Sequence, residues 1–230
     1  MNLKNYVLSL CLLFSIETIS QVNAPITRTI PTIVIDNLVQ GRLYSPNYFP
    51  IRGNPFLIED WSMGSIRLLD KDYLDVPLWY DIYADDLILL YQQPESFQFI
   101  RLSKKHIQHF EIEDRSFINL EYSKYKNVGL ENRFYELVFE DKISLLAERK
   151  VEVITEDKDL ISSFTNKDEW FLIKDNEAHR IRNKKSFLAT LEEKALRKQV
   201  ASFIKKERIV LLKAGSNEWL QVVSYLNTLY

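Results

Sequence analysis

Two histidines form the most metal-like motif in this chain, the H-x-x-H pair of His106 and His109. On a helix this spacing would point both imidazoles in one direction, as chelation of a metal ion requires. Residues 104–112 read as a strand, however, and a separation of three places the two rings on opposite faces of a strand. His179 has no Asp, Glu or His at a matching spacing. The sequence therefore predicts no metal site, and it contains no cofactor motif.

Two carboxylates accompany aromatic residues on one face of a predicted strand, a mixture that suggests carbohydrate processing. Asp75 and Asp81 are separated by six residues, about 20 Å of strand, whereas glycosidase carboxylates lie about 5 to 9.5 Å apart. This pair alone cannot act as a glycosidase. We expect Trp79, Asp81 and Tyr83 to form a face that binds a sugar or a partner. The alternative is that Trp79 and Tyr83 lie under a neighbouring helix or second layer.

Common nucleotide-binding and hydrolase motifs are absent from the chain. Its five glycines, at positions 41, 53, 64, 129 and 215, are too far apart for a phosphate-binding loop or a dinucleotide fingerprint. No G-x-S-x-G motif occurs. A hydrolase would therefore need a site assembled from scattered residues.

Charge is distributed unevenly along the sequence. Residues 174–213 contain 12 Lys and Arg against 5 Asp and Glu, a net charge of +7, and the rest of the chain after residue 20 has 17 against 26, a net charge of −9. Within the basic segment we expect Lys194, Arg197 and Lys198 to bind an acidic partner such as an anionic lipid or lipopolysaccharide. The alternative is a solvated helix face. An overall net charge of −2 argues against nucleic acid.

Residues 1–20 have the features of a secretory signal peptide, with an apolar run from 6 to 16 followed by a polar stretch. The run has 11 residues, and a membrane-spanning helix needs roughly 20. We expect cleavage after Ser20, with Ala24 as a second possible site and lipidation of Cys11 as the alternative. Cleavage would leave no cysteine and no transmembrane segment. The expected location is the periplasm, the outer membrane or the medium.

The full chain has the composition of a folded protein, because 46% of its 230 residues are hydrophobic and 27% are charged. Prolines concentrate in 21–55, which predicts an extended lead-in. Alternation with period two dominates 56–182 and predicts antiparallel strands with short connections. The expected hairpins join 73–83 to 87–91, 134–140 to 143–153, and 170–174 to 178–182, with lesser strands at 65–69, 97–102, 106–112 and 117–122.

The period changes to helical spacing in residues 183–230. Ser186 is expected to cap a helix that breaks near Thr190, and a last helix is expected to begin around Ser216 with Trp219 on its buried face. The predicted fold class is α+β, with an antiparallel meander followed by a C-terminal unit of two or three helices packed on the sheet.

Two stretches, 64–66 and 76–87, resemble a pattern in uncharacterised exported proteins of the Bacteroidota, and 135–142 and 184–188 are similar to later parts of the same proteins. The resemblance covers most of the chain from about residue 53. It implies export and a shared overall fold, and that family carries no assigned activity.

Three functional hypotheses follow from these observations. The first is a non-enzymatic accessory or interaction protein of the cell envelope, which contacts an envelope protein or lipid. The second is a periplasmic carrier that holds a lipid or other apolar ligand between the sheet and the helices. The third is a hydrolase with an unrecognised site.

Overall fold

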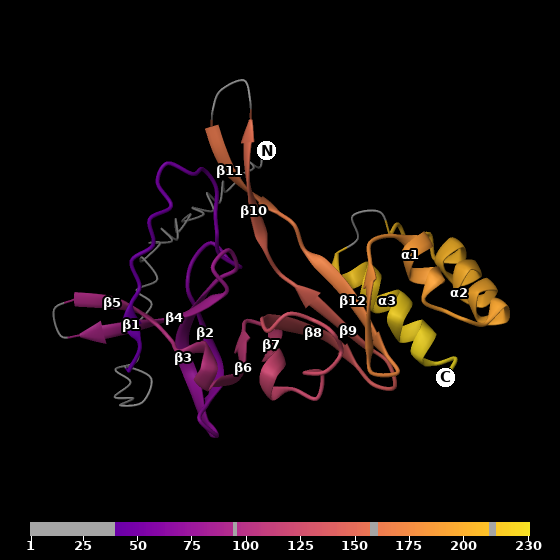
Figure 1. Cartoon of the computed structure of the whole chain (residues 1–230), viewed down its shortest axis with the longest axis horizontal. Coiled ribbons are helices and arrows are strands. Elements are labelled where there is room, and N and C mark those ends of the chain that lie inside the picture. Colours follow the sequence, from indigo (N-terminus) through magenta and orange to yellow (C-terminus); the bar gives the residue numbers. More distant parts are fainter. Residues whose placement is uncertain (1–39, 94–95, 157–160, 212–214) are drawn as a thin grey trace, which may run out of the picture.

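The computed structural model describes residues 40–93, 96–156, 161–211 and 215–230, and it has an α+β fold (Figure 1). The predicted leader, 1–20, and the first part of the expected lead-in lie outside the described residues. The strands are β1 (Arg42–Leu43), β2 (Ser62–Leu68), β3 (Lys71–Asp81), β4 (Asp86–Gln93), β5 (Ser96–Arg101), β6 (Ile107–Ile112), β7 (Arg115–Asn119), β8 (Phe134–Glu140), β9 (Ser144–Glu148), β10 (Val151–Glu156), β11 (Ile161–Asn166), β12 (Glu169–Lys174) and β13 (Glu177–Ile181).

Eleven of the described strands form one sheet, in the order β1-β5-β4-β3-β2-β6-β7-β8-β9-β12-β13, and every pairing in it is antiparallel. The chain runs outward from β2 to β5, returns to the other side of β2 as β6, and continues outward to β13. The predicted antiparallel meander is confirmed. Strands β10 and β11 pair with each other in a separate two-stranded sheet.

The first half of the sheet curls around its own core. Strands β5 and β6 are four positions apart, about 19 Å along a flat sheet, yet the return path of 102–106 includes a 3-10 turn, η1 (Lys104–His106). Asp85, in the turn between β3 and β4, pairs with Lys104 of η1 and accepts a 3.3 Å hydrogen bond from the backbone N–H of Phe134. The enclosed core includes Ile66, Val76, Leu78, Tyr80, Ile107, Phe110 and Phe117.

The three predicted hairpins are present, since β3 pairs with β4, β8 with β9, and β12 with β13. In the last hairpin Asp175 and Asn176 have φ angles of 52° and 61°, the left-handed conformation that a two-residue hairpin turn requires. The lesser strands are present as β2, β5, β6 and β7, the last followed by a second 3-10 turn, η2 (Leu120–Tyr122). The sequence patterns do not predict β1 or β11.

The strict alternation expected in β3 is wrong at one point, because a β-bulge interrupts the strand. The register with β2 shifts between Gly64 and Ile66, so β3 carries one extra residue at this point. Asp75, within the bulge, has a φ of 53°. Tyr73 is consequently buried and Leu74 is exposed, whereas strict alternation would place Leu74 on the same face as the buried Val76.

The expected strand 143–153 is interrupted, which is a second correction. Strand β9 ends two residues before β10 begins, and the returning chain is interrupted at the same level between β11 and β12. The two interrupted segments lie side by side, joined by a 2.9 Å hydrogen bond from the Lys167 N–H to the Lys150 carbonyl. Strands β9 to β12 therefore form one long hairpin that bends in the middle, and its outer half projects from the sheet (Figure 1).

Three helices follow the last strand: α1 (Lys184–Ala189), α2 (Lys194–Lys206) and α3 (Ser216–Asn227). Asn183, not Ser186, is the N-cap of α1. The two residues form a capping box, in which each side chain accepts a 3.0 Å hydrogen bond from the backbone N–H of the other. The expected break after Thr190 is present, and α3 begins where predicted. Among the described residues, no helix combines the length and the apolar character needed to cross a membrane.

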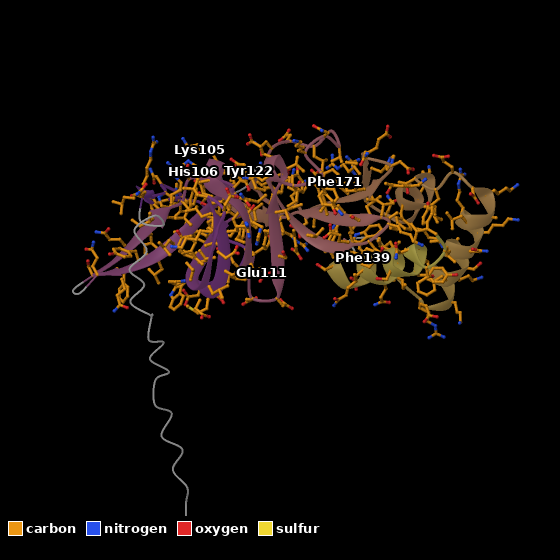
Figure 2. The ribbon with its side chains drawn as sticks, turned by 90° about the horizontal axis from the view of Figure 1, so that it is seen from below. Lys105, His106, Glu111, Tyr122, Phe139 and Phe171 are labelled. Carbon is orange, nitrogen blue, oxygen red and sulfur yellow. The ribbon has the colours of Figure 1, made fainter. Side chains whose placement is uncertain are left out.

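A second core fills the space between the helices and the second half of the sheet. Figure 2 shows Phe139 on the side of α3 and Phe171 on the opposite side, where a third, smaller cluster lies around Tyr125 and Tyr135. The second core contains Leu145, Trp170, Leu172, Phe187, Val200, Ile204, Trp219, Val222 and Leu226.

Residues 40–61 are mostly irregular and are attached to the sheet by Asp81, whose carboxylate is fully buried. Asp81 Oδ2 accepts hydrogen bonds from the phenols of Tyr44, at 2.6 Å, and Tyr48. Oδ1 accepts from the backbone N–H groups of Tyr83 and Ala84 at 3.0 and 2.9 Å. Burial, and then the bond to Asp81, raises the pKa of both phenols, so both remain donors.

Replacing this carboxylate should detach the N-terminal segment. We expect Asp81→Ala to lower the free energy of unfolding by about 3 kcal/mol, because four donors lose their acceptor. Urea denaturation measures the loss, and limited proteolysis near residues 44 to 56 reports detachment. Asp72→Ala is the control, since Asp72 is exposed and forms only a surface ion pair with Arg67; it should cost less than about 1 kcal/mol. Equal losses in the two variants would contradict the assignment.

Candidate functional site

A cleft of about 790 Å³ opens where the N-terminal segment, the sheet, the bend of the long hairpin and α3 meet. Its volume lies within the range of small-ligand sites. The lining residues come from five places in the chain: 54 and 56–59 in the N-terminal segment with Ile82, 114–116 at the start of β7, 136–138 in β8, Arg149, Asn166 and Asp168 at the hairpin bend, and 215–218 with Leu220 in α3.

Arg149 occupies the bend of the hairpin and is buried. Its Nε donates a 2.7 Å hydrogen bond to Glu136 Oε2 in β8. Its Nη1 donates to Asp168 Oδ2 at 2.5 Å, across the bend, and its Nη2 donates to Ser216 Oγ at 2.6 Å, in the first turn of α3. The guanidinium also lies 4.6 Å from the ring centre of Trp170. One side chain therefore joins the sheet, the bend and the last helix.

Glu136 extends this network to β7. Arg115 donates from Nε and Nη2 to the same Glu136 oxygen, at 3.0 and 2.6 Å. Burial alone would raise the pKa of Glu136, but the hydrogen bonds and charges of Arg149 and Arg115 outweigh it, and the pKa lies below its ordinary value. Glu136 is therefore ionised at neutral pH, and its Oε2 accepts three hydrogen bonds from arginine, which makes it unsuited to general acid or base chemistry.

The cleft carries more negative than positive charge. Its two cations, Arg115 and Arg149, are paired with Glu136 and Asp168. Three further carboxylates lie in the lining: Glu59, Asp114 and Glu218. Glu218 accepts a 3.0 Å bond from the Gly215 N–H, whereas Glu59 and Asp114 are exposed and form no ion pair within the described part of the chain. The excess of carboxylates favours a positively charged ligand.

The expected binding face on β3 is covered in part by the protein itself. The ring of Trp79 stacks on Phe56 with a centroid distance of 3.5 Å, and its Nε1 donates to the Ile58 carbonyl at 3.1 Å. Asp81 is buried beneath the same segment. For Trp79, but not for Tyr83, these contacts match the alternative of a covering layer, here an irregular segment. Trp79 does not line the cleft, but it supports Phe56 and Ile58, which do.

Tyr83 is 42% exposed and packs edge-to-face on Tyr48 and Phe164, so it links the N-terminal segment to β11. It does not line the cleft either.

The three basic candidates lie on α2, away from these residues. Lys194, Arg197 and Lys198 are exposed and none of them lines the cleft. Arg197 Nη2 donates to the Glu192 carbonyl at 2.9 Å, and its Nε donates to the Leu191 carbonyl. Its guanidinium is therefore hydrogen-bonded to the loop that connects α1 to α2.

The histidines are not part of the cleft. His106 belongs to η1 and His109 to β6, where it pairs with Ile118 of β7. Across the described residues, no group of three or more metal-binding side chains comes together.

The residues of the Arg149 network are not singled out by any motif. One signal in the sequence could have indicated the bend: three consecutive charges, Glu148 to Lys150, interrupt an otherwise apolar strand pattern. Such an interruption is typical of a chain that leaves a sheet, where polar groups need new partners.

Comparison of the chain with protein-family models, with curated proteins and with solved structures gave no match in any of the three. Function is therefore inferred from the cleft and from the molecular surface.

The Arg149 network can be tested with a substitution that keeps the charge. We expect Arg149→Lys to lower the free energy of unfolding by about 2 to 3 kcal/mol, because one ammonium group cannot reach three diverging partners. Amide exchange in α3 should accelerate as well. The matched control is Arg180→Lys, whose partly exposed side chain pairs with Glu169 at 2.5 Å and should matter little. Unchanged exchange in α3 would count against the three-way link.

The ionisation of Glu136 predicts a pH dependence of stability. Its pKa is lower in the folded chain than the ordinary value of 4.5, so its contribution is complete above that value and is lost as pH falls through the folded pKa. Wild-type stability should therefore decrease more steeply than that of Glu136→Gln between about pH 5 and pH 3, as measured by urea denaturation. The control Glu131→Gln, at an exposed site, should follow the wild-type slope. Identical slopes for all three would refute the prediction.

Proposed function

We propose that this protein is a non-enzymatic interaction module of the cell envelope, whose cleft binds a polar, positively charged segment of an envelope partner. The observation that carries the proposal is the charge of the cleft. Its guanidinium groups are already paired, and Glu59 and Asp114 remain available at its exposed edge. A lysine or arginine side chain of a partner would supply the missing counter-charge.

The state of the buried charges supports a binding role over a catalytic one. A general acid or base needs a pKa near the working pH and access to the substrate. Glu136 has a lowered pKa and two arginine partners, and Ser216 receives its hydrogen bond from an arginine, where an activating base would accept one. Within the described lining of the cleft there is no histidine.

The packing of the second core favours a polar ligand over an apolar one. The space between the sheet and the helices, where a carried lipid would lie, is filled by side chains such as Trp219, Phe187 and Leu172, which are at most 1% exposed. The polar cleft of about 790 Å³ lies beside α3, outside this filled space. The envelope location rests on the signal-like residues 1–20 and on the resemblance described above.

Site-specific photo-crosslinking in the native cells tests the proposal. A photoreactive residue at Asn217, which is exposed and lines the cleft, should form an adduct with one envelope protein, identified by mass spectrometry. The same residue at Lys126, exposed on the loop after η2, should not form that adduct.

A second variant connects the adduct to the charge of the cleft. Glu59→Gln combined with Asp114→Asn should reduce the adduct at Asn217 roughly fivefold, the effect of about 1 kcal/mol of electrostatic attraction. Glu131→Gln combined with Glu177→Gln removes the same charge from exposed positions outside the cleft. An adduct that is insensitive to the first pair, or equally sensitive to both, would contradict the proposed binding mode.

A further inference from the structure

Helix α2 carries five cations and no carboxylate over its 13 residues. All five are exposed: Lys194, Arg197, Lys198, Lys205 and Lys206. An ordinary surface helix mixes both signs of charge, so that neighbouring side chains neutralise one another. No carboxylate within α2 neutralises these cations, so their counter-charge must come from outside the helix.

Three of the five cations share one side of α2, and Arg197 and Lys206 flank them, about 80° to 100° away on either side. At about 100° per residue, Lys194, Lys198 and Lys205 fall within roughly 40° of one another around the axis, and they span about 16 Å along it. The opposite side is buried, because Val200 and Ile204 belong to the second core. The apolar face of α2 is therefore used inside the protein, and the outward face is a basic ridge at the end of the molecule opposite β5 (Figure 1).

A shallow depression of about 540 Å³ adjoins this ridge between α1 and α2. It is lined by Lys184, Lys185 and Arg197 around Leu188 and Ala189, which places cations beside small apolar surfaces. The two bonds from Arg197 to main-chain carbonyls hold its guanidinium in place. Cations beside apolar carbon match the chemistry of a lipid headgroup region.

We propose that the basic ridge of α2 docks on the surface of an anionic lipid bilayer. The cations are spread along a line, so they complement a surface of many anions better than a single bound anion. Because the apolar face of α2 is buried in the core, attachment is electrostatic and peripheral, without insertion of the helix. The excess of acidic residues outside 174–213 is repelled by the same surface and orients the molecule with its helical end on the membrane.

This surface is separate from the cleft, because α2 contributes no residue to the cleft. The two proposals can therefore fail independently. Loss of the Asn217 adduct would leave lipid docking in place, and loss of lipid docking would leave the adduct in place.

Vesicle flotation with the chain lacking residues 1–20 and with the full chain tests the docking. Vesicles of phosphatidylcholine with about 30% phosphatidylglycerol should carry the protein upward at low salt and release it at about 0.5 M salt, where screening shortens electrostatic attraction to a few ångströms. Vesicles of phosphatidylcholine alone should not bind it. Binding that is equal for both compositions, or that persists at high salt, would overturn the proposal.

A charge-matched pair of variants locates the binding surface. Lys194→Gln, Lys198→Gln and Lys205→Gln together should weaken vesicle binding about 100-fold, at about 1 kcal/mol for each lysine near the membrane. These lysines make no ion pair within the described residues, so the fold should be unaffected, as circular dichroism would verify. Lys71→Gln, Lys105→Gln and Lys126→Gln remove the same charge from exposed positions in the sheet half and should change binding less than about threefold.

Two outcomes would overturn the assignment of the surface. If both triple variants lose affinity equally, the attraction is a property of total charge and not of α2. If the protein binds poly-glutamate more tightly than anionic vesicles, the ridge is an interface for an acidic protein.

Discussion

The junction between the first turn of α3, the sheet and the long hairpin depends on the guanidinium of Arg149. It lies where the long hairpin leaves the main sheet, and its three donor nitrogens are bonded to β8, to the returning side of the hairpin and to α3. Burial of an unpaired guanidinium would be strongly unfavourable, so its three acceptors must be present together. The network therefore stabilises one arrangement of these elements over the alternatives, and a cleft results because three elements converge on one side chain without filling the space beside it.

The N-terminal segment closes the other side of this cleft, and a second buried charge holds it there. Asp81 binds Tyr44 and Tyr48, while Trp79 supports the backbone at Ile58. Both walls of the cleft thus depend on polar contacts between segments that are distant in the chain. The apolar cores lie behind these contacts and fix the curvature of the sheet and the position of the helices.

Local patterns predicted much of this fold. The hairpins followed from alternation and turn residues, and the helices followed from apolar spacing and caps, because each of these signals involves neighbours in sequence. The bulge at Asp75 escaped prediction since a single extra residue leaves no mark on composition. The bend at Arg149 lies inside a run of strand-like residues, and its partners are 13, 19 and 67 positions away. Nor could the sequence decide whether Trp79 is open or covered, because the covering segment has no regular period.

The N-terminal segment also affects the order in which the molecule is assembled. Arg52 exchanges backbone hydrogen bonds with Ser162 and Phe164 of β11, at 2.9 and 2.8 Å, about 110 positions further along the chain. Residues 44–58 are among the first of the described residues to be synthesised. They cannot complete their contacts until the hairpin β10–β11 has formed. Non-local pairings of this kind are slow to form. Tyr48, which packs on Phe164 of β11, must stay partly uncovered during that interval. The cleft is therefore completed late in folding, and the nascent chain exposes an aromatic side chain to any chaperone that accompanies it.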